Sequence, residues 1–399
     1  MEKQFTYLMM LEEDGNHYRY FKMIPGSTTF HTETGRVSVA PVVKEYPMSL
    51  WDKVLYRKLS QGYIDRTYLA GIEGGTPGSD FTAGIQDPDV RDLIAYLASS
   101  VSRRVEETYS ISRDLVTPAM ISQTQELILH LDEAEDAEAA NDILKELFIA
   151  LPRRIDDIRS LLLSENPDQD AFIREREVAV LREQDNLDAM KCLVQQRDTD
   201  ICGSGYSILE RWGISCRPVS DAEEEQIIRH LRGSGKHYAR AFRIASSRNR
   251  RNFDRWCEDH EVAEKDIHFL YHGSRNSNYL NILQNGLVLN PDAPKTGHMF
   301  GYGIYFAPKA AKSIGYTSLS GSIWAKGESG RAYLSVFKVA YRNPMHVHRW
   351  SHEMSQYRKD TIYGHDAVYA HGGIDLKNDE VIVYEEAQST LQYLIELKS

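Results

Sequence analysis

The distribution of hydrophobic and polar residues divides the chain into three regions, and the first has the pattern of short strands. Residues 4–11 and 18–24 are rich in aromatic and aliphatic side chains, and the Asp14-Gly15 pair between them is typical of a hairpin turn. Further on, Ser49 is placed to cap a short helix, and Gly62 lies just past its end. This region therefore predicts a small β-rich domain.

Apolar residues recur at helical spacing in the second region, which spans residues 86–197. Asp87 followed by Pro88 predicts the start of its first helix, because aspartate caps helices and proline is tolerated in the first turn. Ser122 and Gln125 have the spacing of a capping box and predict the start of the next helix. The apolar stripes predict a helical core and carry no sign of a cofactor site.

Glycine, proline and serine are dense in residues 71–80, which predicts a linker after the first domain. After residue 200 strand-like and helix-like segments are mixed. We therefore predict an α+β multidomain protein in three parts: a β-rich domain with its linker over residues 1–80, an all-α domain over 86–197 and a mixed α+β domain over 200–399.

Charge and cysteine content narrow the class of protein. The formal net charge of −11 disfavours general binding to polyanions and leaves room only for a local basic patch. Four cysteines without a paired spacing favour free thiols in a reducing, intracellular compartment. The acidic N-terminus lacks a signal-peptide pattern, and no apolar run reaches membrane-spanning length, so no membrane partner is expected.

Candidate chemistry is concentrated at the ends of three predicted strands in the last region. The apolar run 267–271 ends at His272 and Gly273, where exposed backbone groups and a missing Cβ favour ligand contact. Gly301-Tyr302-Gly303 precedes a second strand, 304–307, and a helix is predicted over 309–316. Glu380 opens a late apolar strand over residues 380–384.

These three motifs, in this order, resemble the donor-site signature of the poly(ADP-ribose) polymerases, within the diphtheria-toxin-like ADP-ribosyltransferases. The resemblance lies in His272-Gly273-Ser274-Arg275, in residues 297–307, in residues 312–316 and in the strand that Glu380 opens. It implies an enzyme that uses NAD+ as a substrate, without a metal, and modifies protein acceptors, itself included. In this family the catalytic triad corresponds to His272, Tyr305 and Glu380.

The resemblance also implies a role for each residue that binds NAD+. The Gly273 backbone and the Ser313 hydroxyl would bond the nicotinamide carboxamide, and Tyr305 and Tyr316 would sandwich its ring. His272 would orient the ribose, and Ser274 would assist on the adenosine side. Glu380 would bond the 2′-hydroxyl, offset charge on the anomeric carbon and act as a base. Taken singly, each residue has an ordinary structural explanation; their joint occurrence favours function.

The N-terminal regions extend the resemblance. Thr34-Gly35-Arg36-Val37 is similar to the WGR domain of DNA-dependent members, with Thr34 where tryptophan stands, and this implies contact with DNA breaks. Residues 147–155 are similar to the helical regulatory domain, which implies autoinhibition. The family implies a nuclear protein if the source is eukaryotic and a cytoplasmic one if it is prokaryotic.

Two polar clusters have plainer interpretations. A run of basic residues without an acid favours a solvated face, with a nucleic-acid surface as the alternative; it comprises Arg229, Arg232, Lys236, Arg240, Arg243, Arg248, Arg250 and Arg251. His346, His348 and His352 lack a matching carboxylate or cysteine, so no metal site is predicted.

Three alternatives to a DNA-activated polymerase stay open. Val381 replaces the aromatic residue common in chain-forming members, and residues 343–378 form a short acceptor loop, which fits a mono-ADP-ribosyltransferase that does not respond to DNA. A catalytically silent scaffold that binds NAD+ or DNA ends would release no nicotinamide. An enzyme that modifies nucleic acid would label DNA ends rather than protein.

Overall fold

The computed structural model describes residues 3–12, 17–36, 41–65, 67, 81–111, 113–155, 157–165, 167–200, 206–289, 299–321 and 329–399. The chain forms two compact units, one from residues 1–78 and 105–197 and the other from 79–104 and 198–399. The Asp14-Gly15 turn, Val37, the linker 71–80, Cys202 and residues 297–298 of the second motif lie outside the described residues.

The β-rich part of the first unit is an antiparallel sheet with strand order β4-β3-β2-β1-β5. Its strands are β1 (Thr6–Glu12), β2 (His17–Pro25), β3 (Thr29–Arg36), β4 (Val42–Pro47) and β5 (Ile64–Asp65). Helix α1 (Trp51–Leu59) contributes Trp51, whose ring meets that of Phe30 at 4.9 Å in the core. The prediction that Ser49 caps this helix is wrong, since Leu50 occupies the cap position and Ser49 lies in a 3-10 turn.

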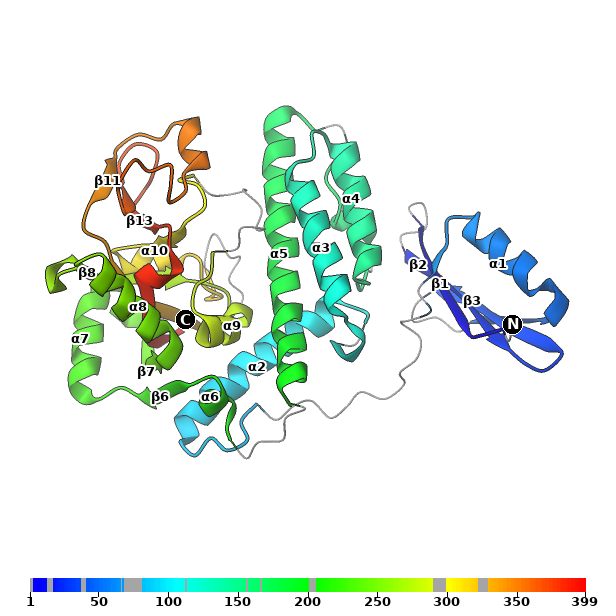
Figure 1. Ribbon diagram of the computed structural model, residues 1–399, viewed down its shortest axis with the longest axis horizontal. Coiled ribbons are helices and arrows are strands. Elements are labelled where there is room, and N and C mark those ends of the chain that lie inside the picture. The colour runs from blue at the N-terminus through cyan, green and yellow to red at the C-terminus, as the bar shows by residue number, and fades with distance from the viewer. Residues whose placement is uncertain are drawn as a thin grey trace. The chain divides into compact units, whose positions relative to one another are not determined.

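The helical segments are α2 (Pro88–Thr108), α3 (Pro118–Asp132), α4 (Ala137–Ala150) and α5 (Gln169–Asp200), and the last three lie side by side (Figure 1). Asp87 accepts from the Val90 amide at 3.0 Å, which confirms it as a helix-starting residue. The capping box at Ser122 is wrong: α3 begins earlier, capped by Thr117. The side-chain amide of Gln125 instead donates to Gln184, because α3 packs against α5.

A buried ion pair joins the segment after α4 to α5. Arg153 and Glu183 contact each other with 4% and 1% of their side chains exposed, and Arg182 also donates to Glu183. The Arg153 guanidinium lies over the rings of Tyr109 and Phe148. Removing one partner of such a pair costs much more than the pair contributes, so residues 147–155 are fixed to the long helix.

The second unit is built around two sheets. The larger is antiparallel with order β6-β7-β14-β10-β8. Its strands are β6 (Ile214–Pro218), β7 (Tyr238–Ser246), β14 (Ser389–Lys398), β10 (Arg331–Ala340) and β8 (Ile267–Gly273). The helices of this unit after residue 198 are α6 (Ile208–Arg211), α7 (Asp221–Leu231), α8 (Ser247–Asp259), α9 (Tyr279–Asn285) and α10 (Ala310–Ile314) (Figure 1).

The smaller sheet has order β11-β12-β13-β9 and is antiparallel except for the β11–β12 pair. Its strands are β11 (Pro344–Val347), β12 (Ala367–Ala370), β13 (Glu380–Val383) and β9 (Ile304–Phe306). The strands predicted around Tyr271, Tyr305 and Val381 are thereby confirmed, as is the α+β class. None of the described helices combines the length and apolar character needed to cross a membrane.

Candidate active site

The two sheets of the second unit meet at the C-terminal end of β8. Tyr271 and Ala307 exchange backbone hydrogen bonds of 2.9 and 2.8 Å, which link β8 to the residue after β9. One residue further on, His272 Nδ1 lies 3.0 Å from the Tyr305 carbonyl oxygen. A carbonyl can only accept, so Nδ1 carries the proton and donates. His272 therefore offers its other ring nitrogen, Nε2, to a ligand.

Burial controls the charge of His272. Its ring is packed edge-on against Phe306 and Phe337, with centroids 6.1 and 6.4 Å away. Desolvation lowers the pKa of this imidazole, and the bond to the Tyr305 carbonyl opposes that effect only in part. The imidazole is consequently neutral at physiological pH, a state suited to hydrogen bonding with sugar hydroxyls.

Gly273 is required by the packing of the site itself. A Cβ at this position would lie 1.8 Å from the backbone oxygen of Ser313, a separation that no side chain tolerates. The sequence predicts that the glycine makes room for a ligand. In the structure, the space that a Cβ would take is filled by the backbone of α10. The Ser313 hydroxyl is buried and donates to the Tyr271 carbonyl at 3.1 Å, so its lone pairs are what it offers a ligand.

The hydroxyl of Tyr305 is held by two backbone groups. Its hydroxyl accepts from the Phe300 amide at 3.0 Å and donates to the Gly301 carbonyl at 2.9 Å. Burial raises the pKa of this phenol, and the Glu380 carboxylate raises it further. Tyr316 is 41% exposed, and burial and Glu380 raise its pKa as well. Both tyrosines therefore stay neutral, and both lie within electrostatic reach of Glu380.

Glu380 opens β13 as predicted, and its carboxylate forms an ion pair with Lys312 on α10. Both side chains are largely buried, with 13% of Glu380 and 12% of Lys312 exposed. In the β13–β9 register Ile382 faces Tyr305, and side chains two apart share a face, so Glu380 projects on the same face as Tyr305. Val381 points to the opposite face and is fully buried.

Two glycines of the middle motif allow close packing. Gly301 has φ of +74°, and a Cβ there would lie 2.1 Å from the Tyr357 carbonyl oxygen. A Cβ on Gly303 would lie 2.2 Å from the Ile382 side chain. Only glycine fits either position, which explains the Gly-Tyr-Gly sequence without a phosphate-binding role.

Ser274, the residue predicted on the adenosine side, lies in the turn after β8. Its amide donates to the Tyr279 hydroxyl at 3.3 Å, and its own hydroxyl accepts from Asn278 at 3.0 Å. The structure thus gathers His272, Gly273, Tyr305, Ser313, Tyr316 and Glu380 around the junction of β8, β9, β13 and α10, with Ser274 at its edge. Sequence reasoning missed the contact of Lys312, whose only signal was its place beside Ser313.

Neighbouring carboxylates neutralise part of the charge of the basic run. In the basic run Arg240 pairs with Asp89 at 2.6 Å and with Glu396 at 2.8 Å, and Arg243 lies over Tyr393. This cluster is therefore not the uniform solvated face expected from the sequence.

In the histidine cluster, His346 Nδ1 lies 2.8 Å from Nε2 of His371. Within the described ranges, no three His, Cys, Asp or Glu side chains are grouped as metal ligands.

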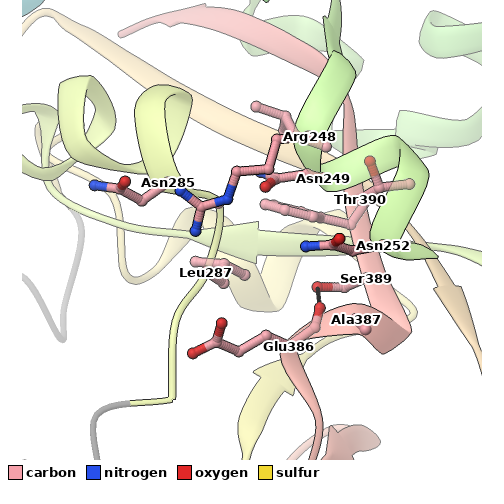
Figure 2. A pocket seen from close by; sticks show the side chains of 12 residues that line it. Arg248, Asn249, Asn252, Asn285, Leu287, Glu386, Ala387, Ser389 and Thr390 are labelled. Carbon is pink, nitrogen blue, oxygen red and sulfur yellow. Dashed lines mark hydrogen bonds between the residues drawn. The ribbon is translucent and has the colours of Figure 1, made fainter. Parts of the chain in front are cut away.

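A small polar cavity lies elsewhere in the unit (Figure 2). It has a volume of about 30 Å³ and lies between the start of α8, the end of α9 and the start of β14. Arg248, Asn249, Asn252 and Asn285 are among the residues that line it, and the Ser389 hydroxyl donates to the Glu386 carbonyl at its edge. A volume of this size holds one or two waters, and none of the predicted site residues lines it.

Comparison with known proteins shows which protein family this part of the chain resembles. Residues 225–325 match the family model of the poly(ADP-ribose) polymerase catalytic domain. The match includes His272, Gly273, Ser274, Tyr305, Ser313 and Tyr316, whereas Glu380 lies beyond it. This part of the second unit is thus similar to the poly(ADP-ribose) polymerase catalytic domain, as the motifs predicted.

Individual relatives include viral and animal proteins. "Uncharacterized protein 101L" of Invertebrate iridescent virus 6 is 27% identical over 46% of this chain and 74% of its own length. "Putative poly [ADP-ribose] polymerase-like 100L" of the same virus is 29% identical over 34% of this chain and 74% of its own length. "Poly [ADP-ribose] polymerase" of Drosophila melanogaster is 32% identical over 32% of this chain. The alignment spans only 15% of that animal protein.

Proposed function

We propose that this protein transfers ADP-ribose from NAD+ to protein acceptors, itself among them, and extends the product into chains. The observation that carries the proposal is the convergence of His272, Tyr305 and Glu380 from three strands on one junction, in a segment similar to poly(ADP-ribose) polymerases. The largely buried Lys312–Glu380 pair supports this assignment, because it holds a charged carboxylate inside the junction and a buried ion pair contributes little to stability by itself.

Each side chain has a role in binding the donor. The neutral His272 imidazole orients the ribose through Nε2, and the Gly273 backbone with Ser313 binds the carboxamide. Tyr305 and Tyr316 offer aromatic faces to the nicotinamide, which is a cation in NAD+ and is attracted by their π-electrons. Because Tyr305 is held at its hydroxyl by two backbone groups, its ring is fixed before the substrate arrives.

The reaction breaks the bond between the nicotinamide nitrogen and the anomeric carbon of the ribose. The electron pair of that bond leaves with nicotinamide, and positive charge develops on the ribose. Glu380 bonds the 2′-hydroxyl and offsets this charge. It also takes the proton of an acceptor hydroxyl while the oxygen of that hydroxyl forms the new bond to the anomeric carbon. Lys312 holds the Glu380 carboxylate in one orientation until the substrate binds.

Product size tests the polymerase part of the proposal. Incubation with labelled NAD+ followed by gel electrophoresis should give a ladder of high-mass product on the protein itself. A single labelled band would identify a mono-ADP-ribosyltransferase, the alternative that Val381 and the short loop over residues 343–378 favour. Label on DNA ends rather than on protein would contradict the choice of acceptor.

Regulation by DNA breaks is the second part of the proposal. The β-rich domain over residues 1–80 would recognise the break, and the helical domain over 86–197 would restrain the α+β domain over 200–399 until then. Protein acceptors, DNA breaks and NAD+ are the proposed partners, in a reducing intracellular compartment. Nicotinamide release should rise when nicked DNA is added; equal release with and without DNA would contradict activation.

A deletion tests autoinhibition separately. Residues 79–104 pack within the same unit as residues 198–399, so a deletion of 105–197 keeps that packing, whereas a deletion from residue 86 removes it. The shorter deletion should raise nicotinamide release without DNA. Unchanged or lower release by a folded protein would count against autoinhibition.

A further inference from the structure

The first half of α2 is fastened to the catalytic unit by a network of charges. Asp92 accepts from Arg331 at 2.8 Å and contacts Arg240, which also pairs with Asp89 at 2.6 Å. Glu396, with only 3% of its side chain exposed, accepts from both arginines at 2.8 and 3.0 Å. A buried carboxylate shared by two guanidinium groups is a rigid connection, so this part of α2 is fixed against β7, β10 and β14.

Tyr96 continues this network one turn further along α2. Its hydroxyl donates to the Arg331 carbonyl at 3.1 Å and accepts from the side-chain amide of Asn276 at 3.2 Å. Its ring lies 4.2 Å below the Arg331 guanidinium and 5.9 Å from the ring of Tyr333. The aromatic body therefore packs on the sheet, while the hydroxyl reaches a loop beside the candidate active site.

Asn276 connects that hydroxyl to the donor-site motif. It lies two residues after Ser274 and is 6% exposed. Its backbone amide donates to the Ser318 hydroxyl at 2.9 Å, and its side-chain amide also donates to the Arg331 carbonyl at 2.9 Å. The turn that follows His272 and Gly273 is thus held from α2, β10 and the segment after α10 together.

We propose that Tyr96 is a positioning residue for the NAD+ site, so that residues 79–104 complete the catalytic unit rather than belong to the regulatory domain. The helix holds the 274–278 turn, and the turn holds the Gly273 backbone and Ser274 where the substrate binds. The proposal rests on the proposed function. Tyr96 lies 180 positions before Asn276 and outside the segment that matches the family model.

The test replaces Tyr96 with phenylalanine in the full-length chain. Tyr96→Phe keeps the ring on Arg331 and Tyr333 and removes only the hydroxyl. Of the contacts that the hydroxyl makes, with Asn276, the Arg331 carbonyl and Ser329, the one with Asn276 reaches the donor-site turn. The KM for NAD+ in nicotinamide release should rise about fivefold, the factor that corresponds to the loss of that one hydrogen bond, while kcat stays within about twofold. Ser99→Ala is the matched control: Ser99 is exposed on the same helix, and within the part of the chain that the structure describes its hydroxyl bonds only the Tyr96 carbonyl. Its KM should equal that of the wild type.

A double variant and hydrogen exchange separate positioning from general stability. Because Tyr96 acts through Asn276, Tyr96→Phe should add nothing to the KM of Asn276→Ala. Amide exchange over residues 272–279 should be faster in Tyr96→Phe, with an unchanged melting temperature, and this readout needs no activity. An unchanged KM with unchanged exchange would overturn the proposal, as would additive effects. A wild type that releases no nicotinamide would instead contradict the proposed function, and exchange would still decide the positioning role.

Discussion

The two sheets of the second unit contribute differently to the candidate site. In the larger sheet β10 and β14 are 10 residues long each, and the sheet presents His272 and the Gly273 backbone at the end of an edge strand. In the smaller sheet the strands have 3 or 4 residues, and the sheet supplies Tyr305 and Glu380. Under the proposed function the large sheet would contribute only to holding the substrate, whereas the small sheet would contribute both a holding group, Tyr305, and the reactive carboxylate of Glu380.

The largest effect is expected from the small sheet. Glu380→Gln preserves shape and removes the charge, so kcat for nicotinamide release should fall by about 10²–10⁴ while NAD+ affinity changes little. Kinetics and calorimetric titration measure the two quantities. Glu386→Gln is the control, because that carboxylate is exposed and its hydrogen bond is to the Leu289 amide, away from the candidate site. Wild-type kcat in Glu380→Gln would remove Glu380 from the mechanism.

The next effect tests the large sheet. Gly273→Ala places a Cβ 1.8 Å from the Ser313 oxygen and forces β8 and α10 apart. NAD+ affinity should fall at least about tenfold, because overpacking typically costs about 1–3 kcal/mol and displaces the carboxamide-binding groups. Gly233→Ala is the control, since a Cβ there meets no atom within 4 Å. Equal affinity in the two variants would contradict the holding role.

A smaller effect is expected at the bridge between Glu380 and α10. Lys312→Met keeps the aliphatic stem and removes the ammonium group that pairs with the Glu380 carboxylate. We expect kcat to fall about tenfold with little change in NAD+ affinity, as orientation is lost. Lys312→Arg should restore part of the rate. Lys359→Met removes the ion pair with Glu385 and serves as the control; a loss confined to NAD+ affinity in Lys312→Met would refute the orienting role.

The smallest effect is a pH dependence of stability. Desolvation lowers the pKa of His272, so protonation of this imidazole favours the unfolded chain. The contribution of His272 to the free energy of unfolding is therefore fully present above about pH 6.5 and is lost as the pH drops below that value. The loss is at most about 1.4 kcal/mol per pH unit for one proton. Denaturant unfolding of the wild type and His272→Gln should show the wild type losing more stability between pH 7.5 and 5.5. Parallel curves would contradict a desolvated, neutral imidazole.

The sequence was sufficient for the strand ends but not for the contacts between distant segments. His272 follows an apolar run, Glu380 precedes one and Tyr305 lies within one directly after Gly303, and local sequence patterns locate such positions. Lys312 and Tyr96 gave no comparable signal, because their partners are set by how α10 and α2 pack. Ser122 had the spacing of a capping box, yet α3 begins at Pro118, since Thr117 caps it and Gln125 packs against α5.

The most direct test of the convergence is a crystal structure with nicotinamide bound. The account predicts the carboxamide on the Gly273 backbone and Ser313, with the ring between Tyr305 and Tyr316 and Glu380 beside the ribose position. Nicotinamide bound away from this junction, or no binding at concentrations that saturate known ADP-ribosyltransferases, would contradict it.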